Sequence, residues 1–197
     1  NWKVTDRSSS MLVMKHEAFR HIEIEMFVPR DQLADTLRFT YEVIKVAVGS
    51  DSTLSANNMR RIESLGMQDA LAGLHNQYCH HYPICVRRVL PDDTLISMAS
   101  GGEQDWYAVS FISYANPAGR DGFFLFANFM AQSMSQLFHA RPHWGKICPL
   151  KAKELTSLYP RFDDFRNICN MLDPQGVFQN DWTAAMLESA GSVEDKS

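Results

Sequence analysis

The order of strand-like and helix-like segments is the feature that most constrains how this chain can fold. From His21 to Val28, Ile22, Ile24, Met26 and Val28 alternate with mostly polar residues, the period-two pattern of a half-buried strand, and Pro29 ends it. Further strands are predicted over residues 84–90, 94–98 and 106–114. Helical segments lie between and after these strands without a strict strand–helix–strand alternation. We therefore expect an α+β fold with a mainly antiparallel sheet covered by helices.

Apolar residues recur at helical spacing in the other segments. Asp31 can cap a first helix, whose apolar positions run from Leu33 to Val48 before Gly49 ends it. The stretch 49–81 is the hardest to interpret, and it offers one helix around residues 67–74. The other expected helices cover residues 123–137, 155–159 and 162–172.

Turn-forming residues lie between several of these segments. Pro91-Asp92-Asp93 separates the strands predicted at 84–90 and 94–98, so we expect these two strands to pair as a hairpin. Asp173-Pro174-Gln175-Gly176 is a turn by composition.

Length and composition are those of one globular domain. The chain has 197 residues, of which 45% are apolar and 21% charged. We expect residues 1–20 to be an incoming connector, residues 21–187 to be the folded domain, and residues 188–197 to be a frayed tail. Because the chain begins Asn1-Trp2 without an initiator methionine, we expect it to be a fragment of a longer protein.

Charge and cysteine usage exclude several classes of function. The formal net charge is −4, which argues against the broad cationic surface of a nucleic-acid-binding protein. Apolar runs fall well short of the roughly 20 residues of a transmembrane helix. The four cysteines are few and irregularly spaced, which indicates reduced thiols and a cytoplasmic or other intracellular location.

General catalytic motifs are mostly absent. The chain contains no dinucleotide-binding glycine motif, phosphate-binding loop or serine-hydrolase elbow. His139 and His143 are four residues apart, but Pro142 lies between them, so we expect no metal there. The cluster Cys79-His80-His81 with Cys85 is better interpreted as a polar loop beside a strand.

The segment Arg141-Pro142-His143-Trp144-Gly145-Lys146 combines two cations, an imidazole and an indole. Proline and glycine, rather than apolar periodicity, shape this segment. Such a loop can direct side chains toward a site. The alternative is an ordinary surface turn anchored by a buried Trp144.

Several short motifs follow one another in a fixed order. They are residues 141–146, Leu158-Tyr159-Pro160-Arg161, Phe165-Arg166 and the run from Leu172 to Asn180. Together they resemble the C-terminal signature of the FAD-dependent sugar-1,4-lactone oxidase family. That family includes arabinonolactone (D-arabinono-1,4-lactone oxidase), gulonolactone and galactonolactone oxidoreductases and alditol oxidases, within the vanillyl-alcohol-oxidase class. Upstream, residues 27–30 and 82–87 are also similar to the family, so the resemblance covers residues 20–187, and only residues 49–81 are longer than expected.

This resemblance implies a division of labour between two halves of a longer protein. An N-terminal domain outside this chain would hold the FAD, and this chain would be the C-terminal cap that shapes the pocket for a sugar lactone or polyol. The implied reaction is oxidation of a CH–OH group by hydride transfer to flavin N5. Residues 1–20 would then connect the two domains.

The resemblance also implies roles for residues of the 141–146 segment. Lys146 is the candidate for the fixed cation that stabilises negative charge on the reduced flavin ring, with a solvated lysine as the alternative. His143 would bind substrate or cofactor or orient the loop, with a satisfied structural histidine as the alternative. Arg141 would support the substrate site or lie at its rim.

The strand Cys85-Val86-Arg87 provides the second implied element. Residues i and i+2 of a strand face the same side, so Cys85 and Arg87 can both face one substrate pocket. The family pattern here is Glu-x-Arg, and Cys85 takes the place of the glutamate. Arg87 can still donate to sugar hydroxyls, but the carboxylate acceptor is missing from this strand. A register shifted by one residue would present Arg88 instead.

Two alternatives to a sugar-lactone enzyme remain. A diverged, non-catalytic interaction or structural module with the same fold is favoured by the loss of the glutamate at Cys85. A flavoprotein of the same class acting on a different alcohol would use the long 49–81 segment to reshape its pocket.

Overall fold

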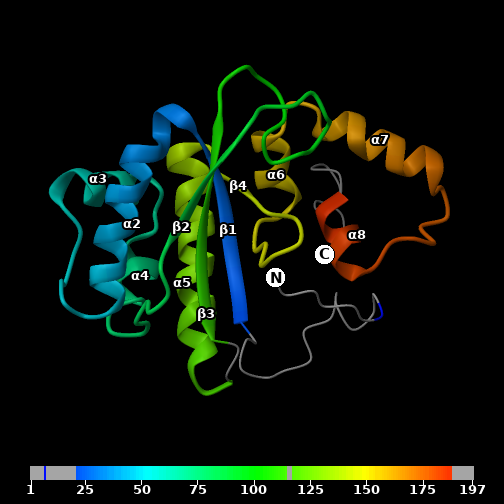
Figure 1. Ribbon diagram of the computed structural model, residues 1–197. Coiled ribbons are helices and arrows are strands. Elements are labelled where there is room, and N and C mark those ends of the chain that lie inside the picture. The colour runs from blue at the N-terminus through cyan, green and yellow to red at the C-terminus, as the bar shows by residue number, and fades with distance from the viewer. Residues whose placement is uncertain (1–6, 8–20, 115–116, 188–197) are drawn as a thin grey trace.

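The computed structural model describes residue 7 and residues 21–114 and 117–187. At its centre is a four-stranded antiparallel sheet with the order β2-β3-β1-β4 (Figure 1). The strands are β1 (His21–Pro29), β2 (Cys85–Val89), β3 (Trp106–Tyr114) and β4 (Arg141–Pro142). The predicted α+β class with an antiparallel sheet is confirmed. The expected connector at 1–20 and tail at 188–197 lie outside the described residues, apart from residue 7.

Helices surround this sheet. They are α2 (Leu33–Ala47), α3 (Ala56–Ser64), α4 (Gln68–Ala72), α5 (Pro117–Phe138), α6 (Ala152–Leu158), α7 (Phe162–Leu172) and α8 (Asp181–Leu187). Helix α3, which is mostly polar, and the short helix α8 were not predicted from the sequence. Asp31 does not cap the first helix, because it lies inside the 3-10 turn η2 (Arg30–Gln32) that precedes α2.

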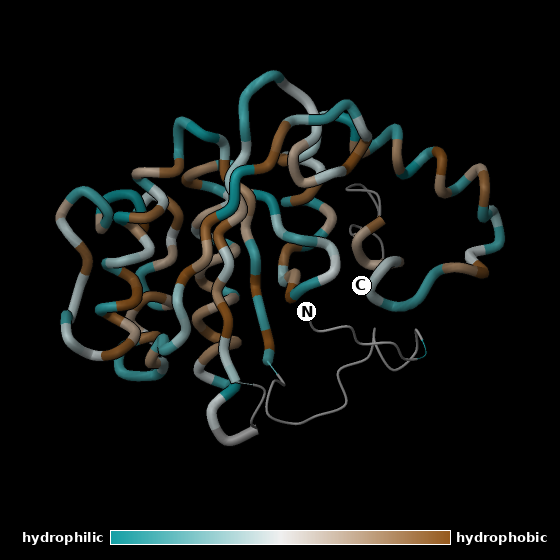
Figure 2. The backbone as a smooth tube through the Cα atoms, viewed as in Figure 1, coloured by the Kyte–Doolittle hydropathy of each residue, from teal (hydrophilic) through white to brown (hydrophobic). Residues whose placement is uncertain are grey.

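The alternation along β1 separates an apolar face from a partly polar one. Ile24, Met26 and Val28 are fully buried on the face that packs against α2 and α5. Brown, hydrophobic positions follow these elements in Figure 2. The opposite face carries Glu23, Glu25 and Phe27, and the last two are also buried. β1 is therefore buried on both faces from Ile24 onward, rather than half-exposed as the pattern predicted.

The predicted hairpin between residues 84–90 and 94–98 is wrong. β2 pairs with β3, and residues 94–98 form a loop. The reason lies in Asp92, whose carboxylate accepts hydrogen bonds from the Thr94 backbone N–H at 3.0 Å and from the Ser97 hydroxyl at 2.6 Å. These local bonds compete with a strand ladder. The fourth strand is instead β4, inside the motif at 141–146.

Residues 49–81 pack against the helical side of the sheet. Tyr78 contacts Phe123 and Phe126 of α5, with ring centroids 5.5 and 4.9 Å apart. The backbone of Gln77 approaches α5 so closely that a Cβ on Gly122 would lie 2.1 Å from the Gln77 carbonyl oxygen. This segment thus covers the core beside α5, on the side of the sheet away from Glu25.

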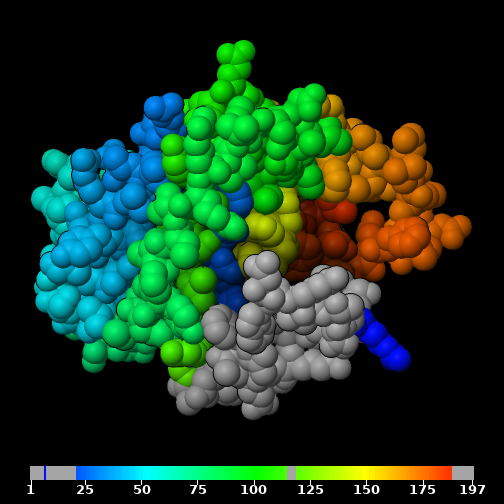
Figure 3. All heavy atoms as spheres, in the orientation of Figure 1, coloured from blue at the N-terminus to red at the C-terminus, as the bar shows by residue number. Residues whose placement is uncertain are grey.

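The helices after residue 150 gather at one side of the molecule, where Figure 3 shows them in orange and red. Several large apolar side chains of α7 and the following turn stay exposed, notably Met171, Leu172, Val177 and Phe178, the last at 86%. An apolar patch of this kind marks a contact surface. Within the described residues, no helix is both long and apolar enough to cross a membrane.

Candidate active site

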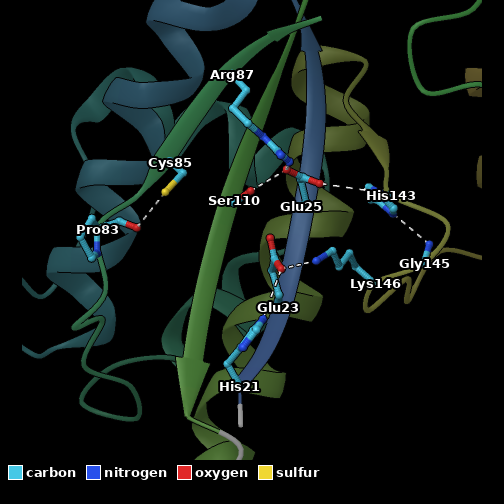
Figure 4. Close-up of polar contacts among 10 residues, drawn as sticks. All are labelled: His21, Glu23, Glu25, Pro83, Cys85, Arg87, Ser110, His143, Gly145 and Lys146. Atoms are coloured by element: carbon cyan, nitrogen blue, oxygen red, sulfur yellow. Dashed lines mark hydrogen bonds and ion pairs between the residues drawn. The ribbon is translucent and has the colours of Figure 1, made fainter. Parts of the chain in front are cut away.

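A polar cluster lies on the face of the sheet opposite α2 and α5 (Figure 4). The strand register aligns Glu25 with Ser110 and Ser110 with Cys85. Side chains of these three residues therefore share one face, and Arg87, two residues after Cys85, shares it too. Three strands thus contribute to one row of polar groups.

Glu25 is at the centre of the cluster and is fully buried. Its Oε1 accepts hydrogen bonds from the Ser110 hydroxyl at 2.6 Å and from the Arg87 guanidinium. His143 approaches from the other side, with Nε2 3.9 Å from Oε2. Burial raises the pKa of Glu25, but the hydrogen bonds from Ser110 and Arg87 and the positive charge of Arg87 lower it by more. The carboxylate is therefore ionised at neutral pH.

Backbone hydrogen bonds hold the loop after α5 against β1. α5 ends at Phe138, and His139 adopts a left-handed φ of 54° that turns the chain back toward the sheet. β4 then pairs with β1. Beyond it, the His143 N–H donates to the Glu25 carbonyl at 2.9 Å, and the Ile147 N–H donates to the Glu23 carbonyl at 3.1 Å. The loop residues between these two bonds lie beside the two glutamates.

The His143 ring has a defined orientation. The Gly145 backbone N–H donates to its Nδ1 at 2.9 Å. Because Nδ1 acts as an acceptor, Nε2 carries the proton of the neutral imidazole. Nε2 is the nitrogen that faces Glu25. The loop thus presents an N–H donor to the buried carboxylate.

Lys146 lies on the same side of the sheet as His143. Its ammonium donates to Oε2 of Glu23, and His21 Nε2 lies 3.8 Å from the same oxygen. The Lys146 side chain is partly exposed, so the ammonium keeps donors for a further partner. The structure therefore places Lys146 and His143 in the polar cluster with Arg87.

Arg141 does not join the cluster. The residue is 5% exposed, and its guanidinium lies 4.3 Å from the ring centroid of Trp106 and 4.6 Å from that of Tyr159. It donates to the Leu158 carbonyl at 3.0 Å and the Ser100 carbonyl at 2.6 Å. These contacts anchor the 141–146 segment to residues Leu158 and Ser100.

Trp144 also anchors the loop. Its Nε1 donates to the Ile96 carbonyl at 2.7 Å, and its ring stacks on Tyr159 with centroids 5.2 Å apart. The two interpretations of the 141–146 segment are thus compatible, because Trp144 packs while His143 and Lys146 face the cluster.

The two alternatives for the strand register can be compared directly. Cys85 is exposed on the row of Ser110 and Glu25, where its thiol lies 3.9 Å from the Pro83 carbonyl oxygen. Arg87 reaches the buried carboxylate, whereas Arg88 donates to Asp105 at 2.8 Å. The arginine that meets the polar row is therefore Arg87.

Glu23, Glu25 and Ser110 were not among the residues predicted from the sequence to form the site. The available signal was the alternation of β1, which places both glutamates on the face away from Ile24 and Met26. Two glutamates at alternate positions of one strand indicate a carboxylate on a single face of the sheet. Such a carboxylate can take the place of the glutamate that is missing at Cys85. Ser110 carried no signal of its own, because only the pairing of β3 with β1 places it against Glu25.

A metal centre finds no support among the described residues, where no group of three or more His, Cys, Asp and Glu side chains could hold an ion. The arrangement instead combines an ionised carboxylate with arginine, histidine and lysine donors. Such a set can bind hydroxyl groups and stabilise developing negative charge.

Comparison with known proteins adds a family match. Residues 1–186 match the sequence pattern of a protein family described as D-arabinono-1,4-lactone oxidase. A protein from an uncultured marine euryarchaeote named long-chain alcohol oxidase is 78% identical over 195 residues, which are 99% of this chain and 41% of that protein.

Two more distant relatives are also named as oxidases. L-gulonolactone oxidase of Mus musculus is 32% identical over 120 residues, covering 61% of this chain and 27% of the relative. Alditol oxidase of a Streptomyces species is 43% identical over 51 residues, covering 26% of this chain and 12% of the relative. The chain therefore spans less than half the length of each of these proteins.

Proposed function

Because the chain belongs to the D-arabinono-1,4-lactone oxidase family, we propose that it is the C-terminal, substrate-facing part of an FAD-dependent oxidoreductase. The proposed reaction oxidises a CH–OH group of a sugar-1,4-lactone or related polyol. The observation that carries this proposal is the convergence of Arg87 and His143 on the buried Glu25 carboxylate, with Lys146 beside it. These side chains come from two strands and one loop, and they lie on one face of the sheet.

The residues of the cluster fit a flavin as partner. Lys146 has three N–H donors and uses one of them on Glu23, and His143 presents a further N–H. These two residues would hold the flavin ring by donating to its acceptor edge. When bound, FAD supplies the acceptor for the hydride that leaves the carbinol carbon.

Each residue of the cluster has a proposed task. Arg87 orients the substrate by donating to its hydroxyl and carbonyl oxygens. Lys146 stabilises negative charge that develops as the alcohol is oxidised. Arg141 is a positioning residue, because its guanidinium holds the loop that carries His143 and Lys146. Cys85 lies at the edge of the row, where it can contact substrate.

The apolar patch of α7 and the following turn supports the proposed partner, an N-terminal FAD-binding domain of the same protein. The patch exposes four large apolar side chains, those of Met171, Leu172, Val177 and Phe178. Covering apolar surface of this kind with another domain lowers the free energy. The chain spans 41% of its euryarchaeal relative, so a large part of a protein of that length is available to cover the patch.

A second candidate is the same chemistry on a long-chain alcohol. The name of the euryarchaeal relative suggests it. An apolar cavity of about 400 Å³ supports it, since Trp144, the residue after His143, lines this cavity together with Ile96, Phe162 and Phe165. An alkyl chain would be a chemically suitable occupant.

The experiment uses the full-length protein that contains this chain. It is purified, its flavin absorbance is recorded, and loss of that absorbance is followed anaerobically after addition of aldono-1,4-lactones, alditols or long-chain alkanols. Reduction by a lactone or alditol is expected, whereas reduction by alkanols alone would favour the second candidate. Absence of flavin, or a flavin that none of these alcohols reduces, would leave the non-catalytic module as the better interpretation.

A further inference from the structure

One oxygen of the Glu25 carboxylate has no hydrogen-bond partner among the described residues. Oε1 accepts from Ser110 and Arg87, but Oε2 is buried and accepts nothing. Burying an ionised oxygen without a donor is unfavourable. This oxygen therefore has the capacity to bind a donor from outside the protein.

The nearest protein group to Oε2 suggests which donor fits. His143 Nε2 lies 3.9 Å from Oε2, which is too long for a direct hydrogen bond. An oxygen atom beside the line joining them can lie about 2.8 Å from both. Because Nε2 carries a proton, that oxygen must accept from His143 while donating to Glu25. A hydroxyl group does both, whereas a ketone or an ether oxygen cannot donate.

Arg87 holds the other oxygen of the same carboxylate. Its guanidinium reaches Glu25 across the sheet, and its side chain is 64% exposed while that of Glu25 is fully buried. The arginine can therefore swing toward solvent without disturbing the core, and its remaining N–H groups can follow a bound ligand.

We propose that Glu25 Oε2 and His143 Nε2 form the subsite for the hydroxyl group that is oxidised, a role that rests on the proposed function. Glu25 accepts the hydrogen bond of that hydroxyl, and His143 donates to its oxygen. The subsite selects an alcohol over its own carbonyl product, because the product lacks the hydrogen that Glu25 requires. Glu25 Oε2 thus favours binding of the alcohol substrate and release of the carbonyl product.

The test measures hydroxyl recognition directly in the flavin-containing full-length protein. Affinities for D-arabinono-1,4-lactone, for each of its monodeoxy derivatives and for a long-chain alkanol with its parent alkane are measured by titration. In the wild type, removal of one particular hydroxyl is expected to weaken binding about 10- to 100-fold, the range for a hydrogen bond to a charged group. In Glu25→Gln this preference is expected to fall to a few-fold, because a neutral amide is a weaker acceptor.

Two further variants separate recognition from folding. His143→Phe keeps an aromatic ring beside Phe27 but removes the N–H donor, so it is also expected to reduce the hydroxyl preference. Glu42→Gln is the matched control, because Glu42 on α2 likewise accepts from Ser55 and Asn58 but lies outside the cluster. Its hydroxyl preference should equal that of the wild type. Flavin content and thermal midpoint report whether each variant is folded.

The outcomes distinguish this inference from the proposed function. A wild-type flavin that lactone reduces, combined with the same hydroxyl preference in Glu25→Gln and His143→Phe, would overturn the subsite alone. A preference that Glu25→Gln abolishes, in a protein whose flavin no alcohol reduces, would overturn the proposed function and would leave Glu25 and His143 as a hydroxyl-binding pair only. If the wild type has no hydroxyl preference, the subsite fails whether or not its flavin is reduced. A wild type that binds none of these ligands, and whose flavin none of them reduces, would overturn both. If Glu25→Gln does not fold, the hydroxyl preference of His143→Phe tests the subsite instead.

Discussion

The Arg87 guanidinium donates to the Glu25 carboxylate across the intervening strand β3, although the two residues are 62 positions apart in sequence. Glu25 is fully buried and Arg87 is mostly exposed. One partner has therefore lost its hydration, while the other can still reach water. The ion pair therefore joins a buried carboxylate to an exposed guanidinium on the face where we place the substrate.

Removing Arg87 should destabilise the protein more than removing its neighbour. In Arg87→Met the buried carboxylate loses a charged donor, and we expect a loss of about 1–2 kcal/mol, discounted for the exposure of the arginine. In Arg88→Met only a solvent-screened surface pair with Asp105 is lost, so a smaller effect is expected. Urea unfolding of the full-length protein measures both values. Equal effects would argue against a special role for the Glu25–Arg87 pair.

Lys146→Met should slow flavin reduction in the full-length protein. The variant removes the ammonium that we propose to balance developing negative charge, so we expect a decrease of about 10- to 100-fold in the reduction rate. Stopped-flow measurement of anaerobic reduction checks this. Lys153→Met on α6 provides the control, since Lys153 is exposed and outside the cluster. An unchanged rate in Lys146→Met would remove Lys146 from the mechanism.

Arg141→Met should act through stability. The buried guanidinium satisfies the Leu158 and Ser100 carbonyls and stacks between two aromatic rings, so its loss is expected to lower the free energy of unfolding by about 2–3 kcal/mol. Arg161→Met, on an exposed arginine paired with Asp164, should change it by less than about 0.5 kcal/mol. Chemical denaturation of both variants makes the comparison. A stable Arg141→Met protein with weakened substrate binding would instead support direct substrate contact.

Two glycines of α5 should respond oppositely to alanine. A Cβ at Gly122 would clash with the Gln77 carbonyl, so Gly122→Ala is expected to destabilise by about 1–3 kcal/mol. Gly119 has nothing within 4 Å of the added Cβ, and Gly119→Ala should be neutral or stabilising by up to about 1 kcal/mol, because alanine favours the helix. Thermal unfolding tests the sign in each case. A destabilised Gly119→Ala would show that this end of α5 is more tightly packed.

Asp92 should make the loop at 91–100 sensitive to acid. Burial raises the pKa of Asp92, but hydrogen bonds from Ser97 and Thr94 lower it by more, so the folded-state pKa lies below its ordinary 3.8. The stabilisation is therefore full well above pH 3.8 and is lost as the pH falls through the lower folded value. Asp92→Asn should flatten this part of the stability profile. Unfolding free energies measured across the acidic range test this, and parallel profiles would contradict it.

Much of the fold follows from local patterns in the chain. The alternation in β1 and the aromatic and β-branched run of β3 predicted both central strands, because each pattern reports burial within one segment. The stripe along α5 did the same for the longest helix. The hairpin prediction failed, because the pattern at residues 94–98 could not show that Asp92 would bind Thr94 and Ser97 locally.

The candidate site divides in the same way. The sequence alone determined that Arg87, His143 and Lys146 carry suitable chemistry, since their residue types and their motifs are local properties. Only the tertiary structure decided that Arg87 donates to Glu25, that Lys146 donates to Glu23, and that Arg141 is held among aromatic rings. Strand order and register bring together residues far apart in the chain, and desolvation changes what each group can do once it is there.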